Sequence, residues 1–217
     1  MTSAPSPDLS RIRHWVFDLD NTLYPPEARL FDQIETKMTD YVMRELGLPQ
    51  ADANALRDRY WREHGTTLAG LMRNQNIAAA PFLDEVHDID LGGLSADPLL
   101  AARIAALPGR KIFYTNGSRR HAERVLEARG LTDVMDVIFG IEDANHIPKP
   151  DLAAFERIFG LAELPGREAA MFEDDPRNLL VPHQMGLATV HVAPVADPAP
   201  HIHHHTDDLS AFLSRIV

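Results

Sequence analysis

The chain has 217 residues, of which 45% are apolar and 24% charged, so it is long enough for one globular domain with room for an insertion. It carries 21 lysines and arginines against 32 aspartates and glutamates, a formal charge of -11, and such an acidic surface repels nucleic-acid polymers and anionic membranes. The lack of cysteine excludes disulfide scaffolds, thiolate zinc sites and thiol nucleophiles, and it favours the cytoplasm as the compartment.

The predicted elements begin with one short strand and continue with a wholly helical stretch. The apolar run at residues 15–17 stops abruptly at polar residues, as a buried strand does. Residues 25–96 show only helical spacing, with apolar residues at every fourth position from 30 to 42 and Gly47 as the stop of the first helix. Further helical segments are predicted over residues 52–64, 68–72 and 82–86.

Beyond residue 97, predicted strands and helices alternate. Helices are predicted over residues 119–129, where Ser118 can cap the start and Gly130 suits a left-handed end, and over residues 152–159. The apolar runs between them predict strands at residues 111–114, 137–139, 169–172 and 187–192. This alternation is typical of a parallel sheet. The sequence therefore predicts an α/β protein with its core at residues 1–24 and 97–217 and an inserted helical cap at residues 25–96.

Two carboxylates directly follow the first predicted strand. Asp18 and Asp20 are two positions apart, so in an extended chain they share a face at the edge where open parallel sheets bind ligands. Like charges so close together raise a pKa unless a cation lies between them. The alternative is an aspartate-rich turn that caps the next helix.

Three more polar clusters follow later strands. Thr115, Asn116 and Gly117 lie at the start of a predicted helix, where unpaired backbone N–H groups attract an anion. Lys149 precedes another helix and can neutralise a carboxylate or a phosphate. The acidic run at residues 173–175 needs a cation if it is buried. Taken alone, the first of these clusters is more often a plain strand-to-helix turn, a single lysine is usually just solvated, and the acidic run on a surface is an ordinary loop.

Together and in this order, the four clusters resemble the signature of the haloacid dehalogenase-like hydrolase superfamily. The matching segments are FDLDNT at 17–22, YTNGS at 114–118, KP at 149–150 and FEDDPRN at 172–178. The resemblance implies a Rossmann-like core and a phosphoryl transfer that depends on Mg2+ and passes through an aspartyl-phosphate.

The resemblance also implies a role for each matched residue. Asp18 is expected to be the nucleophile and Asp20 the general acid and base. The side chains of Asp18 and Asp174 and the carbonyl of Asp20 are expected to bind the metal, with Glu173 outside direct contact and Asp175 as a second candidate ligand. Thr115, Asn116 and Gly117 are expected to bind the phosphate, and Lys149 to balance its charge. The chemistry agrees, because a carboxylate attacks phosphorus only when the negative phosphate oxygens are screened.

The cap sequence is similar to that of the pyrimidine 5′-nucleotidase subgroup, on the segments at residues 60–71 and 86–90. This resemblance implies a small phosphorylated metabolite as the substrate, namely a nucleoside monophosphate. Polar cap residues are expected to face it, although hydrogen bonding between cap and core is an equally weighted alternative. These residues are His64, Thr66, Thr67, His87 and Asp88. Tyr60 and Trp61 are expected in the core.

Two other functions remain as alternatives at this stage. One is a phosphatase or phosphomutase for another small metabolite, such as a sugar phosphate, and the other is a non-catalytic metabolite-binding protein. Dehalogenation is disfavoured because it does not need Asp20 or the acidic loop. The histidines at 201–205 lack the acidic or cysteine spacing of a closed zinc site, and a C-terminal helix is expected to start at Thr206 and Asp207.

Overall fold

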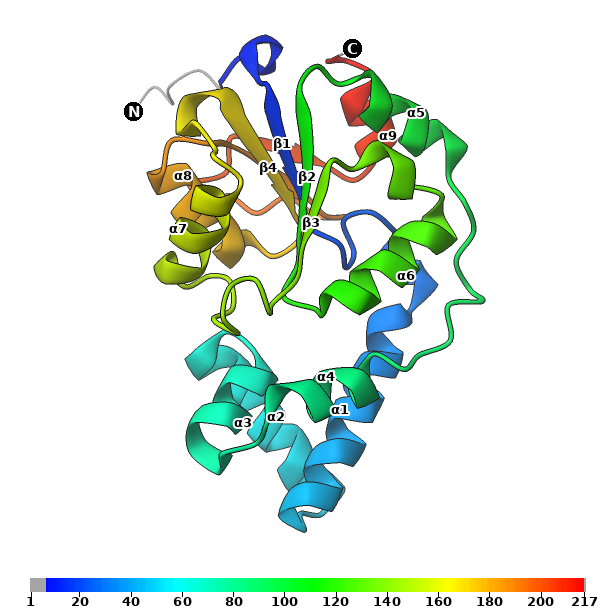
Figure 1. Ribbon diagram of the computed structural model, residues 1–217, viewed down its shortest axis with the longest axis vertical. Helices are drawn as coiled ribbons and strands as arrows, with labels where there is room; N and C mark the ends of the chain where they lie inside the picture. Colours follow the sequence, from blue (N-terminus) through cyan, green and yellow to red (C-terminus); the bar gives the residue numbers. More distant parts are fainter. Residues whose placement is uncertain (1–6, 217) are drawn as a thin grey trace.

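The computed structural model describes residues 7–216, and these contain a six-stranded parallel sheet in the order β3-β2-β1-β4-β5-β6 (Figure 1). The strands are β1 His14–Phe17, β2 Arg110–Tyr114, β3 Val137–Phe139, β4 Ala169–Glu173, β5 Ala188–Val192 and β6 His204–Thr206. The predicted strands at 15–17, 111–114, 137–139, 169–172 and 187–192 are therefore confirmed to within one residue at each end. The α/β fold with a parallel sheet is confirmed as well.

The central strand β1 aligns its two neighbours, β2 and β4, and so positions the residues that follow the three strands. Its residues Trp15, Val16 and Phe17 are fully buried, because helices cover both faces of the sheet. Phe17 lies in register with Phe113 of β2 and with Phe172 of β4, and its ring stacks on Phe172 at 4.8 Å between centroids. The three strands thus end in step, and the residues that follow them meet at one edge.

Five helices pack on the two faces of the sheet, with α5, α6 and α9 on one face and α7 and α8 on the other (Figure 1). The helices are α5 Pro98–Ala106, α6 Arg119–Arg129, α7 Leu152–Leu161, α8 Leu180–Gln184 and α9 Leu209–Leu213. The predicted ends of α6 are confirmed: Ser118 accepts a hydrogen bond from the His121 amide, and Gly130 ends the helix at φ 69°. Short 3-10 turns are η1 Leu9–Arg11, η2 Pro26–Ala28, η3 Thr132–Val134, η4 Gly166–Glu168 and η5 Pro176–Leu179.

A separate group of four helices, the helical insert, forms between β1 and α5 and lies beyond one edge of the sheet (Figure 1). Its members are α1 Leu30–Leu46, α2 Gln50–His64, α3 Thr67–Gln75 and α4 Ala79–Val86. The predicted stop of α1 is confirmed, because Gly47 adopts φ 64°. Helices α2 and α3 approach so closely that a Cβ on Gly70 would lie 2.2 Å from the Tyr60 ring. The insert is therefore tightly packed, and its buried residues form one continuous apolar cluster with those on one face of the sheet.

One buried arginine holds the two connections of the insert to the core. Arg129, at the end of α6, donates from Nε to the Leu23 carbonyl at 3.1 Å and from Nη1 to the Ser95 carbonyl at 2.5 Å. Its Nη2 forms an ion pair with Asp97 at 2.8 Å. Arg129 thus holds together the two segments through which the chain enters and leaves the helical insert.

Three features of the C-terminal and central parts differ from the sequence prediction. Strand β6 was not predicted, because the sequence HHT of an edge strand has no apolar run. Helix α5 was also missed. The last helix begins at Leu209 with Asp208 as its cap, whereas Thr206 and Asp207 were expected to open it. In the described part of the chain, no helix is both long and apolar enough to cross a membrane.

Candidate active site

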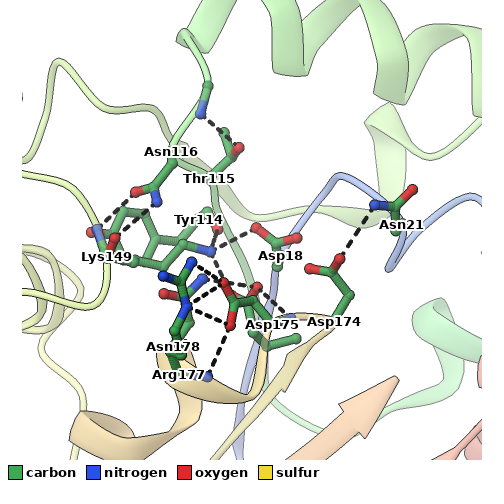
Figure 2. Close-up of polar contacts among 12 residues, drawn as sticks. Asp18, Asn21, Tyr114, Thr115, Asn116, Lys149, Asp174, Asp175, Arg177 and Asn178 are labelled. Carbon is green, nitrogen blue, oxygen red and sulfur yellow. Dashed lines mark hydrogen bonds and ion pairs between the residues drawn. The ribbon is translucent and has the colours of Figure 1, made fainter. Parts of the chain in front are cut away.

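The ends of β1, β2 and β4 bring three of the predicted clusters together, and the Lys149 loop adds the fourth (Figure 2). Lys149, only 1% exposed, donates from Nζ to Asp18 Oδ1 at 2.6 Å and to Glu173 Oε2 at 2.6 Å. A third, longer contact joins Nζ to the Tyr114 carbonyl at 3.3 Å. A single ammonium thus links the ends of all three central strands.

Three carboxylates lie close together here, and two of them, Asp18 and Glu173, contact this ammonium. Asp18, Glu173 and Asp174 each offer an oxygen, and these oxygens lie within 4.8 Å of one another. Burial, together with the charge of Glu173, raises the pKa of Asp18 to about 8. Burial likewise raises the pKa of Glu173 to about 7 and, with the charge of Asp18, the pKa of Asp174 to about 7. The carboxylates outnumber the cation, so ionising all of them is unfavourable without further positive charge.

The donor chemistry of this group fits a divalent cation. The available ligand atoms are carboxylate oxygens, which Mg2+ prefers, and the group lies in a cavity with room for water ligands. Asn21 donates to Asp174 Oδ2 at 3.3 Å, and the His191 imidazole lies 2.9 Å from the Asp174 carbonyl. The position of Asp174 is therefore fixed from two sides.

The rest of the acidic run is used differently. Glu173, expected outside the metal group, lies inside it, and its Oε1 accepts a hydrogen bond from Asn178 at 3.1 Å. Asp175 lies outside the group and forms an ion pair with Arg177 at 2.6 Å. Glu173, and not Asp175, thus joins Asp18 and Asp174 in this group.

The turn after β2 presents the expected polar groups, but not all of them are free. Thr115 is buried, and its Oγ1 accepts a hydrogen bond from the Gly117 amide at 2.9 Å. Asn116 exchanges two hydrogen bonds with the backbone of Lys149, at 3.1 and 2.8 Å. Asn116 therefore holds the lysine loop against this turn in the structure.

Asp20 lies in a pocket of aromatic and imidazole rings beside this cluster. Tyr24 donates its hydroxyl to Asp20 Oδ1 at 2.5 Å, and His121 Nε2 lies 3.6 Å from the same oxygen. His87 stacks on His121 with 4.4 Å between ring centroids. Burial raises the pKa of Asp20, but the contacts with His121 and Tyr24 outweigh burial and lower it overall. These contacts therefore favour the charged form of Asp20 in the substrate-free site.

A cavity of about 440 Å³ separates these strand ends from the helical insert. The strand-end residues that line it are Asp18, Asp20, Thr115, Asn116, Gly117, Lys149, Glu173 and Asp174. The insert contributes apolar and polar residues, namely Phe31, Ile34, Glu35, Met38, Arg57, Asp58, Trp61, Thr66, Thr67, Phe82, Leu83, Val86 and His87. Such a size and mixed lining suit a small organic ligand.

The insert residues predicted to face a substrate divide into two groups. Thr66, Thr67 and His87 line the cavity. His64 does not, because its ring contacts Asn74 at 3.0 Å, and Asp88 is exposed on another surface. Those two expectations are not supported by the geometry.

Tyr60 and Trp61 were both expected in the core, and only the first expectation is confirmed. Tyr60 is buried between α2 and α3, whereas Trp61 is 47% exposed and lines the cavity. Consecutive helical residues point about 100° apart, so one of them faces inward and the other outward. The Arg177 guanidinium lies 3.6 Å from the centroid of the Trp61 ring, so this pair joins the acidic loop to the insert.

Comparison with protein-family models matches residues 12–186 to the haloacid dehalogenase-like hydrolases. The chain belongs to this family. Phosphate metabolism protein 8 of Saccharomyces cerevisiae is 27% identical over 187 residues, which are 79% of this chain and 58% of that protein. The hydrolase thus spans 58% of the length of this relative.

Two solved structures illustrate the range of the fold. A phosphatase of the same family from Thermococcus onnurineus has a TM-score of 0.62 at 16% identity, over 94% of this chain and 98% of that one. A 2-haloacid dehalogenase from Pseudomonas syringae pv. Tomato DC3000 has a TM-score of 0.59 at 21% identity, over 95% and 100% of the two chains. At these identities the likeness concerns the fold.

Sequence reasoning missed several residues around the site of this hydrolase. His121 and Tyr24 contact Asp20, His191 contacts the Asp174 backbone, and Arg177 covers Trp61. The one available signal was the place of His121 on the inward face of a predicted helix that starts at the sheet edge. The other contacts depend on tertiary packing.

The histidines at 201–205 are used in local backbone contacts. The Nε2 atoms of His201, His204 and His205 lie 2.8, 3.1 and 2.7 Å from the carbonyls of Pro176, Pro7 and Ala193. Within residues 7–216, the group of Asp18, Glu173 and Asp174 is the candidate metal site. Of these contacts, the one from His205 reaches the residue that follows β5, the strand with which β6 pairs.

Proposed function

We propose that this hydrolase is a magnesium-dependent phosphatase that acts on nucleoside monophosphates, in particular pyrimidine nucleotides, through an aspartyl-phosphate. The observation that carries the proposal is the group of Asp18, Glu173 and Asp174, in which Asp18 and Glu173 contact Lys149. All four residues line the cavity between the strand ends and the insert. Asp18 and Asp174 would hold the magnesium ion, with the Asp20 carbonyl as a further ligand and Glu173 beside them. When bound, the ion screens the phosphate oxygens from the attacking carboxylate.

The side chains then divide the reaction between them. An oxygen of Asp18 forms a bond to phosphorus while the bond from phosphorus to the ester oxygen breaks, and Asp20, which enters this half-reaction protonated, supplies the proton that the leaving oxygen takes. In the second half, Asp20 removes a proton from the water that attacks the aspartyl-phosphate. Inorganic phosphate leaves and Asp18 is restored. Lys149 and the Thr115 to Gly117 turn stabilise the transferring phosphoryl group.

The nucleotide part of the proposal has two supports. The insert offers both an apolar wall, with Phe31, Ile34 and Phe82, and polar groups such as Arg57, which together suit a nucleoside. The cap segments at 60–71 and 86–90 are also similar to those of pyrimidine 5′-nucleotidases. The name of the relative from Saccharomyces cerevisiae, which refers to phosphate metabolism, agrees with a phosphate ester in general.

A phosphatase or phosphomutase for sugar phosphates is the second candidate. The observation that favours it is the group of polar side chains on the insert, Glu35, Arg57 and Asp58, which can bind sugar hydroxyls. Dehalogenation uses the same fold, but it needs no group of acids that binds a cation. A purely non-catalytic binding role leaves the assembled Asp18, Asp20, Lys149 and Asp174 without a purpose.

The test is phosphate release from a panel of nucleoside monophosphates and sugar phosphates with and without Mg2+. We expect release with Mg2+ and a preference for UMP and CMP. Asp18→Asn should lower kcat by about 10⁴-fold or more, as the loss of a nucleophile does, while the exposed control Asp133→Asn retains activity. Full activity of Asp18→Asn would overturn the proposal. Transfer of phosphate to a second sugar with little free phosphate would favour the mutase.

A further inference from the structure

His121 is a buried side chain without a conventional partner beside the candidate active site. Its side chain has 0% exposure, and among the described residues neither ring nitrogen has a hydrogen-bond partner. Burying an unpaired polar ring lowers stability relative to an apolar residue of similar size. Such a group in a native interior calls for an explanation, and a role at a reactive site is one.

The orientation of the His121 ring is fixed by its surroundings. The residue lies in the first turn of α6, where its own amide bonds the Ser118 cap. The His87 ring stacks on it at an interplanar angle of 12°, and His87 Nδ1 lies 3.0 Å from Ser118 Oγ. This packing directs Nε2 of His121 at the carboxylate of Asp20, 3.6 Å away.

The contacts of Asp20 are distributed unevenly between its two oxygens. Oδ1 accepts the Tyr24 hydroxyl at 2.5 Å and faces His121, whereas in the described part of the chain no hydrogen bond reaches Oδ2. Asp20 also lines the cavity. One oxygen is therefore held from two sides, and the other is available for proton transfer.

We propose that His121 is a positioning residue for Asp20: together with Tyr24 it holds Oδ1, so that Oδ2 is directed at the leaving oxygen of the substrate. This inference rests on the proposed phosphatase function. His87 supports it by fixing the plane of the His121 ring. The role concerns only the proton that Asp20 transfers, so its loss matters most where the leaving group needs that proton.

The test compares kcat/KM for UMP, whose alkoxide is a poor leaving group, with kcat/KM for p-nitrophenyl phosphate, whose leaving group departs unprotonated. His121→Phe retains the stack on His87 and removes the nitrogens. We expect it to lower kcat/KM for UMP by about 10- to 100-fold, part of the 10²–10⁴-fold that general acid catalysis supplies, and to change the value for p-nitrophenyl phosphate by less than about 3-fold. His121→Gln should restore most of the loss, because its amide nitrogen can take the place of Nε2 opposite Oδ1.

A double-mutant cycle makes the test specific. In an Asp20→Asn background, His121→Phe should lower kcat/KM for UMP by less than about 2-fold, because two residues that act through one another are not additive. His183→Phe, a half-buried histidine on α8 away from the cavity, is the matched control and should alter neither substrate. If His121→Phe does not fold, Tyr24→Phe replaces it, since it removes the other contact to Oδ1 and should give the same dependence on the leaving group.

The outcomes separate the two levels of inference. An active wild-type enzyme in which these variants lower kcat/KM for both esters equally, or for neither, would overturn the role of His121. So would a full His121→Phe effect in the Asp20→Asn background. A wild-type enzyme that releases phosphate from neither ester would overturn the proposed function itself, and the role of His121 with it.

Discussion

The strand ends and the helical insert line opposite sides of one cavity, and they do so with different kinds of side chain. On the strand side, Asp18, Glu173 and Lys149 are buried, and each of the two carboxylates lies 2.6 Å from the Lys149 ammonium. On the insert side, Phe31 and Trp61 are partly exposed, and apolar surface predominates. The strand ends thus present a buried, charged group to the cavity, whereas the insert presents partly exposed aromatic rings.

The largest expected effect comes from a substitution in the charged group at the strand ends. Lys149→Met leaves the Asp18 and Glu173 carboxylates buried without their cation, and losing one partner of a buried ion pair costs about 3–5 kcal/mol. The exposed pair of Lys37 and Asp88, 3.9 Å apart, provides the control, because Lys37→Met should cost less than about 1 kcal/mol. Urea unfolding in the absence of Mg2+ measures both. Equal effects would mean that the buried cluster is not under electrostatic strain.

Measuring Tm as a function of pH tests the same charged group at the strand ends. In the metal-free protein the pKa of Asp18 is raised from 3.8 to about 8 and those of Glu173 and Asp174 to about 7. The folded state therefore binds more protons than the unfolded state, and stability should fall as pH rises from about 4 to about 8. We expect Tm to drop by roughly 5 °C over this window and Mg2+ to restore it. A Tm that rises with pH, or that ignores Mg2+, would contradict the assignment of a cation site.

On the recognition side, Trp61→Ala should separate binding from stability. Removing the ring opens one wall of the cavity and frees Arg177, so we expect KM for UMP to rise by about 10-fold. Tm should change by less than about 3 °C, because the side chain is half-exposed. Leu99→Ala, an exposed apolar residue on α5, is the control. A large fall in Tm with unchanged KM would place Trp61 among the structural residues instead.

The smallest expected effect distinguishes two neighbouring residues of the insert. Thr67 is buried and lines the cavity, so Thr67→Val should raise KM for UMP by about 3- to 10-fold through the loss of a hydrogen-bonding group. His64→Ala should leave kcat/KM within about 2-fold, because its ring contacts Asn74 outside the cavity. Steady-state kinetics checks both. A larger effect of His64→Ala than of Thr67→Val would show that the insert closes differently over its substrate.

Secondary structure could be predicted best where it depends on local sequence, or where a strand is buried on both faces of the sheet. Strand β1 could be predicted because Trp15, Val16 and Phe17 are apolar without alternation, and its end located Asp18. Strand β6 could not, since His204 and His205 pair at the sheet edge through contacts that no local pattern records. The strand-end clusters were predicted to meet, and the structure brings Asp18, Lys149 and Asp174 together.

What escaped prediction was mainly the contacts between segments that are distant in the chain. His121 reaches Asp20, and Arg177 covers Trp61, only after the sheet and the insert have packed. Helical periodicity could place Tyr60 and Trp61 on a helix, but it could not say which of them faces the interior of the insert. The catalytic roles of the site residues stay predictions that the experiments above can check.

Arg129 has a consequence for how such an enzyme can change. Because this one side chain ties Leu23 to Ser95 and Asp97, the segment between these residues behaves as a cassette whose two ends are already joined. A longer, shorter or different cassette can be joined at the same point, but it has to keep Tyr24 and His87, because Tyr24 contacts Asp20 and His87 stacks on the ring of His121.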